Sequence, residues 1–409
     1  MKQDNIYVGL DIGTTKVCVV ILRKNEDESL DIIGVGRAPN TGLRKGVVIN
    51  IDATVSAITE AIRDAEKVSG VQVKSVCAGI AGGHIKSINS RGIIAVKNRE
   101  VTAKDVDRVI ESASAIDVPI GTEVLHIIPQ QYILDGQSEI KDPIGMNGVR
   151  LEVDVHIVTG AVSSAKNILK SCERAGISVD DIVLEQLASS EAVLSSDEKE
   201  IGVCLMDGGG GTTDIAVFKR GAVCHTGVMQ IGGNNFTRDL SIGLNTPESE
   251  AEKLKKKYGS VWLDSTIDDT VDVPSVGGRP PRKISRPVLT QILQARCEEI
   301  FQMYLGELQK RQLLDFLGAG IVLTGGMSNL AGIDLLAQSI FELPVRIGKP
   351  LKVGGLRDLV DDPVYSTGVG LAIHAAKKGH QQVKISKGTD EKVFSHVLAR
   401  MKSWFGEFF

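Results

Sequence analysis

Short apolar runs alternate along the chain with longer segments in which apolar residues recur at helical spacing. Residues 6–10, 17–22, 201–206 and 215–218 are nearly continuous apolar runs, which are typical of buried β-strands. Residues 53–68 carry apolar side chains at helical spacing instead, which predicts an amphipathic helix. Strands that alternate with helices in this way predict an α/β fold.

Residues 84–159 interrupt this alternation and predict a small α+β insertion. They contain several short β-like segments and one helix, which we expect after the capping residues Thr102 and Asp105. Turn signals such as Asp142-Pro143 separate these segments. An insertion with a purely structural role is an alternative that the pattern leaves open.

The last part of the chain carries an amphipathic pattern of its own. Residues 381–390 are polar and have the composition of a linker, and residues 391–409 predict a helix with one apolar face beside basic residues. Trp and Phe on such a face favour the surface of a membrane, whereas the alternative is a helix that docks on the protein itself. The residues expected to enter the membrane are Phe394, Val397, Leu398, Met401, Trp404, Phe405 and Phe408.

Four consecutive glycines lie between two of the apolar runs, in the segment from Asp207 to Asp214. Glycine lacks a Cβ atom, so successive backbone N–H groups can turn inward and surround phosphate oxygens. A run of glycines alone would predict a flexible turn, but strands and acidic residues on both sides favour phosphate binding. Asp207 and Asp214 flank the glycines and are well placed to hold a divalent cation through water, and we expect Asp207 to be a Mg²⁺ ligand. The residues expected around the phosphates are Gly209, Gly210, Gly211, Thr212 and Thr213.

A second hairpin near the start of the chain has the same order of strand, Asp, Gly, Thr-Thr, charged residue and strand. Its phosphate-binding residues would be Gly13, Thr14 and Thr15, and Asp11 would be the second Mg²⁺ ligand through water. Lys16 would add a positive charge for the β- and γ-phosphates. Two such hairpins predict two similar half-molecules that face one nucleotide. Neither hairpin fits the dinucleotide-binding motif or the P-loop.

Two further segments are candidates for the ribose and base side of the same pocket. Glu252, Lys255 and Lys256 have the spacing to share one helix face, although a solvated surface is the usual explanation of such a charge run. A predicted strand ends in Gly325 and Gly326 before Met327. Because glycine lets the backbone approach a flat purine closely, we expect this turn to form the third side of the pocket.

A predicted helix that begins at Glu185 supplies the candidate catalytic residue. Either Glu185 or Gln186 would face the cleft, and we favour Glu185 as the group that orients a water at the γ-phosphate. The alternative is an exposed first turn, because acidic residues are favoured at helix N-termini.

Composition narrows the classes of protein that need to be considered. The 409 residues are enough for two lobes with separate cores, and the net charge of −4 gives no reason to expect nucleic acid. The 6 cysteines form no C-x-x-C pair and the 7 histidines form no H-x-x-x-H pair, so we expect reduced thiols and no zinc site. We expect no secretory signal and no transmembrane span, and therefore a protein kept in the cytoplasm.

Together these motifs resemble the actin-like ATPase superfamily and, within it, the FtsA family of bacterial division proteins. The matching segments are residues 9–16, 126–129, 207–214, 274–282 and 322–326 together with the terminal amphipathic helix. The loop at 274–282, Pro-Ser-Val-Gly-Gly-Arg-Pro-Pro-Arg, and the terminal helix are specific to the family, because the hairpins indicate only the superfamily. Gly208 departs from the family, which more often has a branched aliphatic residue there, so we expect a looser second hairpin.

The resemblance implies an actin-like two-lobed fold with four subdomains. The implied parts are a first-lobe core (1–83 and 160–198), the inserted α+β subdomain (84–159), a second-lobe core (199–225 and 301–380), a second-lobe subdomain that docks FtsZ (226–300), the linker (381–390) and the membrane-binding helix (391–409).

The resemblance also implies a function in cell division. Such proteins bind ATP and Mg²⁺ with at most slow ATPase activity, polymerise on the cytoplasmic face of the inner membrane at the division septum, tether FtsZ filaments there and recruit other division proteins. The acidic C-terminal peptide of FtsZ would suit Arg279, Arg282 and Lys283. The alternatives are a sugar- or acetate-type kinase and a pilus-assembly ATPase of the same fold.

Overall fold

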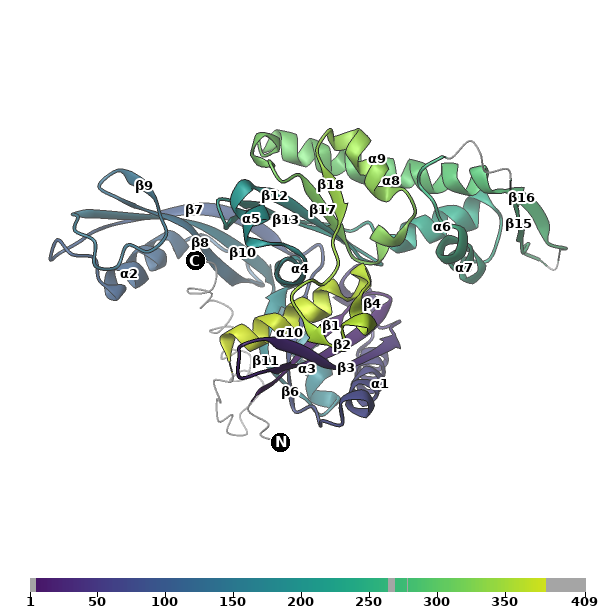
Figure 1. The fold of residues 1–409 in the computed structure, drawn as a ribbon, viewed down its shortest axis with the longest axis horizontal. Coiled ribbons are helices and arrows are strands. Elements are labelled where there is room, and N and C mark those ends of the chain that lie inside the picture. The colour runs from purple at the N-terminus through teal and green to yellow at the C-terminus, as the bar shows by residue number, and fades with distance from the viewer. Residues whose placement is uncertain (1–4, 264–268, 278, 380–409) are drawn as a thin grey trace.

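The fold is organised around two large sheets with the same strand order (Figure 1). The structure is a computed structural model that describes residues 5–263, 269–277 and 279–379. The first sheet has the order β11 (Ser178–Leu184), β6 (Ser75–Ile80), β1 (Ile6–Ile12), β2 (Lys16–Lys24), β3 (Leu30–Pro39) and β19 (Gly354–Gly355). The second has the order β18 (Val345–Ile347), β17 (Ile321–Thr324), β12 (Val203–Gly208), β13 (Thr213–Lys219) and β14 (Ala222–Met229).

Strand directions repeat between the two sheets as well. In the first sheet β1, β2 and β3 are antiparallel, and β6 and β11 run parallel to β1. In the second, β12, β13 and β14 are antiparallel, and β17 and β18 run parallel to β12. The prediction of two similar half-molecules is therefore confirmed. We call the half built on the first sheet the first lobe and the half built on the second sheet the second lobe.

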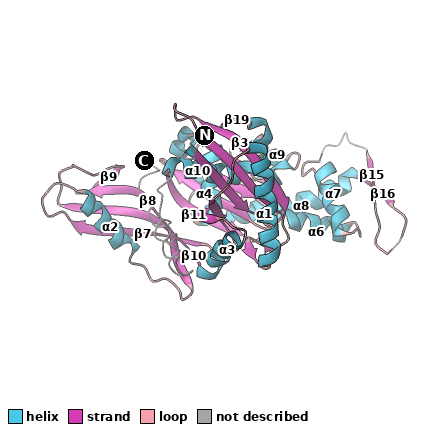
Figure 2. Cartoon of the chain, turned by 90° about the horizontal axis from the view of Figure 1, so that it is seen from below, coloured by secondary structure: helices cyan, strands magenta, loops and turns pink. Residues whose placement is uncertain are grey.

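Helices cover the outer faces of both sheets. Figure 2 shows α1 (Ile51–Ser69) and α3 (Val162–Arg174) on the outer face of the first sheet. The helix predicted over residues 53–68 is confirmed, and it begins after Asn50, whose side chain accepts a hydrogen bond from the Ala53 N–H. The remaining elements of the two lobes are β4 (Leu43–Arg44), β5 (Val47–Val48), α5 (Ser196–Ile201), α8 (Arg286–Lys310), α9 (Ile333–Phe341) and the short helices η2 (Leu314–Phe316), η3 (Gly326–Asn329), η4 (Arg357–Val360) and η5 (Pro363–Tyr365).

Two helices, α4 (Glu185–Val193) and α10 (Ser366–Lys378), lie between the two sheets (Figure 1). Most of their residues are buried, so neither helix has a wide polar face. They approach each other closely because residue 370 is glycine: a Cβ atom there would lie 1.8 Å from the carbonyl oxygen of Ala188. The small residues of both helices therefore set the spacing of the lobes.

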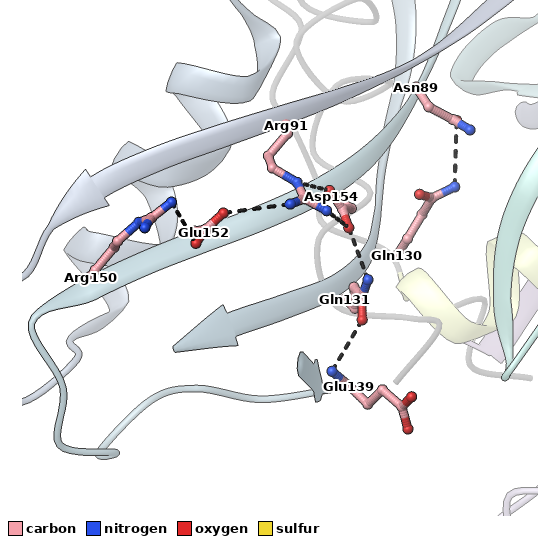
Figure 3. A network of polar contacts seen from close by, with 8 residues as sticks. All are labelled: Asn89, Arg91, Gln130, Gln131, Glu139, Arg150, Glu152 and Asp154. Carbon is pink, nitrogen blue, oxygen red and sulfur yellow. Dashed lines mark hydrogen bonds and ion pairs between the residues drawn. The ribbon is translucent and has the colours of Figure 1, made fainter. Parts of the chain in front are cut away.

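The predicted insertion forms a separate sheet at one end of the molecule. Its order is β7 (Lys86–Ala95), β10 (Arg150–Ala161), β8 (Thr122–Leu134) and β9 (Gln137–Ile140), with α2 (Ala103–Ser114) on one face. The opposite face carries a polar network in which Arg91 binds Asp154 through two bonds of 2.6 and 2.9 Å (Figure 3). Arg150 binds Glu152 on the same face at 3.0 Å. We call this α+β unit the insert.

At the opposite end lie α6 (Gly233–Gly243), α7 (Glu248–Tyr258) and the hairpin β15 (Thr270–Val273) and β16 (Arg282–Ser285) (Figures 1 and 2). Within the part of the chain that the structure describes, no helix is long and apolar enough to cross a membrane. The linker predicted at 381–390 and the helix predicted at 391–409 lie outside the described residues.

Candidate functional site

A cavity of about 690 Å³ lies between the two lobes, at the ends of β1, β12 and β17. It brings together every segment that the sequence predicts for the nucleotide pocket. The predicted residues that line it are Asp11, Gly13, Thr14, Thr15, Lys16, Glu185, Asp207, Gly209, Gly210, Gly211, Thr212, Glu252, Lys255, Lys256, Gly325, Gly326 and Met327. Thr213 does not line the cavity, because it is buried in β13 and its hydroxyl donates to the Ile231 carbonyl at 2.8 Å.

The two hairpins have the same geometry and meet at their tips. Each closes with an equivalent bond of 2.9 Å, from Gly13 N–H to Lys16 O in the first and from Gly209 N–H to Thr212 O in the second. The tips touch, since a Cβ atom at Gly210 would lie 2.5 Å from the Thr15 methyl group. Glycines at the second tip are therefore required by contact with the first hairpin, as well as by phosphate access.

The looser second hairpin expected from Gly208 is not observed. The space of the missing side chain is occupied by Met327, because a Cβ atom at residue 208 would lie 2.6 Å from the Met327 Cβ atom. Met327 follows the Gly325-Gly326 turn and is itself buried. The turn and the second hairpin therefore support each other.

Acidic side chains are concentrated on one wall of the cavity. Asp207 and Asp214 are buried there and Glu185 is half-buried, and loss of solvent raises the pKa of each carboxyl group. The negative charges of Asp11, Asp207 and Asp214 raise the pKa of Glu185 further, so that it lies well above its ordinary value. Carboxylates crowded in this way favour a divalent cation.

Lys16 is the cation of the same wall. Its ammonium group binds Asp11 at 2.8 Å. Burial lowers the pKa of Lys16, but the charge and hydrogen bond of Asp11, together with Cys18 and Asp207, outweigh this effect and the pKa is raised overall. Lys16 is therefore charged at neutral pH and faces the phosphate side of the cavity.

Three more side chains complete this wall: Asp214, which the sequence places at the end of the glycine run, and Ser189 and Thr367, which the sequence does not identify. Asp214 lies opposite Asp207 in the β12–β13 register, and its Oδ1 atom has no hydrogen-bond partner among the described residues. Ser189 of α4 and Thr367 of α10 both donate to Asp207 Oδ2, the second at 3.1 Å. Spacing along the chain gives no signal for Ser189 and Thr367, because each is far from Asp207 in sequence.

The donor set of the wall fits a hydrated Mg²⁺ ion. Among the residues that the structure describes, no three His, Cys, Asp or Glu side chains are arranged to hold a metal ion by themselves. Mg²⁺ usually takes one or two carboxylates and completes its shell with water and phosphate oxygens. The orphaned Asp214 oxygen and the two carboxylates of the hairpins, Asp11 and Asp207, provide acceptors for such a shell.

The opposite wall is formed by α6, α7 and η3. Lys255 binds Glu252 at 2.7 Å and donates to the Gly233 carbonyl at 2.9 Å, so it fixes the start of α6 beside the second hairpin. Lys256 is exposed and reaches Glu252 at 3.3 Å. Glu252 and Lys256 are therefore the α7 groups that remain able to meet a ligand.

The three basic residues expected to meet a partner are remote from the cavity. Arg279, Arg282 and Lys283 are exposed near or on the β15–β16 hairpin, and the Arg282 guanidinium donates to the Leu244 carbonyl. The seven residues expected at the membrane, between 394 and 408, lie outside the described residues.

Comparison with known proteins identifies relatives along the whole chain. A family model described as "Cell division protein FtsA" matches residues 204–370, and one described as "SHS2 domain inserted in FTSA" matches residues 82–159. The cell division protein FtsA of Neisseria meningitidis is 47% identical, over 99% of this chain and 99% of its own length. That of Pseudomonas aeruginosa is 44% identical over 99% and 98%, and that of Escherichia coli K12 is 40% identical over 98% and 97%.

Solved structures share the fold at much lower identity. A chain from the PilM-PilN type IV pilus biogenesis complex has a TM-score of 0.66 and 16% identity, with 90% of this chain and 98% of that chain covered. MreB5 of Spiroplasma citri bound to ADP has a TM-score of 0.56 and 16% identity, with 91% and 97% covered. The actin-like fold expected from the sequence, with its inserted α+β unit, is therefore confirmed.

Proposed function

The chain belongs to the FtsA family of cell division proteins, and from this membership we propose that it is an ATP-binding protein that polymerises on the cytoplasmic membrane at the division septum. There it tethers FtsZ filaments and recruits other division proteins. The observation that carries the ATP-binding part is the cavity, where both phosphate hairpins and the Gly325-Gly326 turn meet.

In this proposal the hairpins hold the phosphates and α7 holds the ribose and base. Backbone N–H groups at Gly209–Gly211 and Gly13–Thr15 line the phosphate side, and Lys16 supplies the positive charge. Asp11 and Asp207 hold Mg²⁺ through water, and the ion neutralises phosphate charge when it is bound. Gly326 forms an open surface for the purine, because a Cβ atom there meets no atom closer than 3.6 Å.

Glu185 is the proposed water-orienting group. Its carboxyl lies at the cavity on a half-buried residue, and its raised pKa favours the protonated form until a cation lowers that pKa. A bound Mg²⁺ ion would therefore favour the carboxylate, which accepts a proton from water. Hydrolysis is expected to be slow, and ATP then acts mainly as a ligand for assembly.

Isothermal titration with Mg-ATP and with ATP in EDTA tests the nucleotide site. We expect Asp207→Asn to reduce affinity about tenfold in Mg²⁺ and to change it little in EDTA, because the variant removes the proposed cation ligand and keeps its shape. Asp197→Asn, an exposed acid in α5, is the matched control. Equal Mg-ATP affinity for the Asp207 variant and the control would contradict the proposed metal role.

The tethering part of the proposal rests on family membership and on two features of the sequence. The segment 391–409 has the apolar face and basic flanks of an interfacial helix, and the basic residues beside the β15–β16 hairpin suit an acidic peptide such as the FtsZ C-terminus. Single helices of this kind bind membranes reversibly, so stable attachment requires many copies in one polymer. We propose the same division of the chain into four subdomains, a linker and a terminal helix that the sequence predicts. Family membership sets aside the kinase and pilus-assembly alternatives.

A further inference from the structure

The segment 126–129, which matches the family without an assigned role, places His126 beside the candidate catalytic residue. His126 is fully buried in β8 of the insert. Its Nε2 atom accepts a hydrogen bond of 3.2 Å from the backbone N–H of Leu184. Leu184 is the residue immediately before Glu185. A side chain of the insert thus contacts the backbone at the edge of the nucleotide cavity.

The location of Leu184 makes this contact important for the orientation of the Glu185 side chain at the cavity. Leu184 ends β11, an edge strand, and is also the N-cap residue of α4 without a side-chain cap. None of the described strands lies beyond the outer edge of β11, so its outward amides need other acceptors. The Ile182 amide is bound by its neighbour Asp181 at 2.9 Å, and the Leu184 amide is bound by His126.

The same insert is attached to the second lobe. Ser87 donates to the Thr226 carbonyl at 2.8 Å, and Gln130 donates to the Val223 carbonyl at 2.9 Å. Both acceptors lie on β14, which leads within a few residues to Gly233 on the cavity wall. The insert therefore contacts backbone segments that reach the cavity from both lobes.

We propose that His126 is a positioning residue for Glu185, through which the insert controls the reactivity of the nucleotide site. The proposal rests on the proposed ATP-binding function. His126 acts through the Leu184 backbone and does not touch the nucleotide. Because Nε2 accepts, the imidazole is neutral and carries its proton on Nδ1.

Four variants separate positioning from general stability. His126→Gln keeps an acceptor at the reach of Nε2, whereas His126→Asn is equally polar but shorter, and His126→Leu removes the acceptor. Ile127→Ala is the control, because Ile127 lies next along β8 in the apolar cluster shared with α2. Thermal melting shows which variants fold. If His126→Leu does not fold, the comparison of His126→Gln with His126→Asn still tests the proposal.

Three measurements follow on each folded variant. Amide hydrogen exchange at Leu184 reports the bond itself, and we expect it to accelerate at least tenfold in the Asn and Leu variants. Single-turnover hydrolysis of Mg-ATP should slow by about 10- to 100-fold in the same variants. Mg-ATP affinity should change less than twofold, and His126→Gln should recover most of the rate.

The outcomes distinguish the two proposals. Unchanged exchange at Leu184 in the Asn and Leu variants, or rates in Ile127→Ala as low as theirs, would overturn the positioning role. Failure of the unsubstituted chain to bind Mg-ATP would instead overturn the proposed function. In a chain that binds but does not hydrolyse, unequal exchange in the Gln and Asn variants still supports the placement of Glu185 by His126, and equal exchange contradicts it.

Discussion

The chemistry of the phosphate side of the cavity is determined by Asp11, Glu185, Asp207, Asp214 and Lys16. Asp207 is central among them, since it receives hydrogen bonds from both helices that lie between the lobes, through Ser189 and Thr367. A change in the position of Asp207 would therefore alter its hydrogen bonds to α4 and α10. Conversely, a nucleotide that binds a cation at Asp207 would stabilise one arrangement of these helices.

The two glycines of the Gly325-Gly326 turn should differ in their tolerance of alanine. Gly325 has φ +78°, and a Cβ atom there would lie 2.3 Å from Asp207 Oδ1 and 2.6 Å from the Gly208 carbonyl oxygen. We expect Gly325→Ala to cost about 1–3 kcal/mol of folding free energy, measured by thermal or urea unfolding. In Gly326→Ala the new methyl group would make only an ordinary contact of 3.6 Å with Val364 Cγ2, so we expect folding to be unchanged and nucleotide binding to weaken. Equal stability of the two variants would contradict this account of the turn.

At the scale of elements, the contact between α4 and α10 controls the spacing of the lobes. Gly370→Ala would place a methyl carbon 1.8 Å from the Ala188 carbonyl oxygen and force the helices apart. We expect a loss of at least about 1–3 kcal/mol in the free energy of unfolding.

The control for this prediction is the same substitution in a helix with free space. Gly306 lies within α8, and a Cβ atom there would meet no atom within 4 Å. Gly306→Ala should stabilise the protein by about 1 kcal/mol through helix propensity. Denaturant unfolding of both variants checks the pair, and a Gly370 variant as stable as the parent would show that the helices are not in firm contact.

The junction between the insert and the second lobe should be sensitive to pH. His156 is buried between Asn89 of the insert and Thr226 of β14, with bonds of 2.7 and 2.9 Å. Burial lowers the pKa of His156 to about 3, and the positive charge of Arg311 acts in the same direction. The folded state therefore binds fewer protons than the unfolded state, so stability falls as the pH is lowered from about 6.5 toward about 3.

A neutral replacement checks this pH dependence. His156→Asn cannot take up a proton, and we expect its melting temperature to fall less between pH 7 and pH 5 than that of the parent. His84, whose pKa burial also lowers, is present in both proteins and cancels in the comparison. Identical pH profiles would exclude His156 as the sensitive group.

At the scale of the whole molecule, the repeated hairpin motif was sufficient to predict two similar lobes around one nucleotide. The motif is local, and its strands need only antiparallel pairing between neighbours in sequence. The sequence did not reveal the roles of Ser189, Thr367 and His126, which act across long separations in sequence. Their roles depend on how α4, α10 and the insert pack, which no local spacing encodes. Thr213 does not line the cavity for a different, local reason, because alternation along β13 turns its side chain away.

The central claim is that the chain links FtsZ to a membrane when ATP is bound. The most direct measurement is co-sedimentation with liposomes containing anionic lipid, in Mg-ATP and with FtsZ, of the full chain, a chain ending at Asp390 and the variant Trp404→Glu. We predict that only the full chain carries FtsZ into the pellet, because truncation removes the segment predicted to form the membrane-binding helix and Trp404→Glu places a charge on the predicted apolar face. Equal recovery of FtsZ with all three proteins, or none with the full chain, would contradict the account.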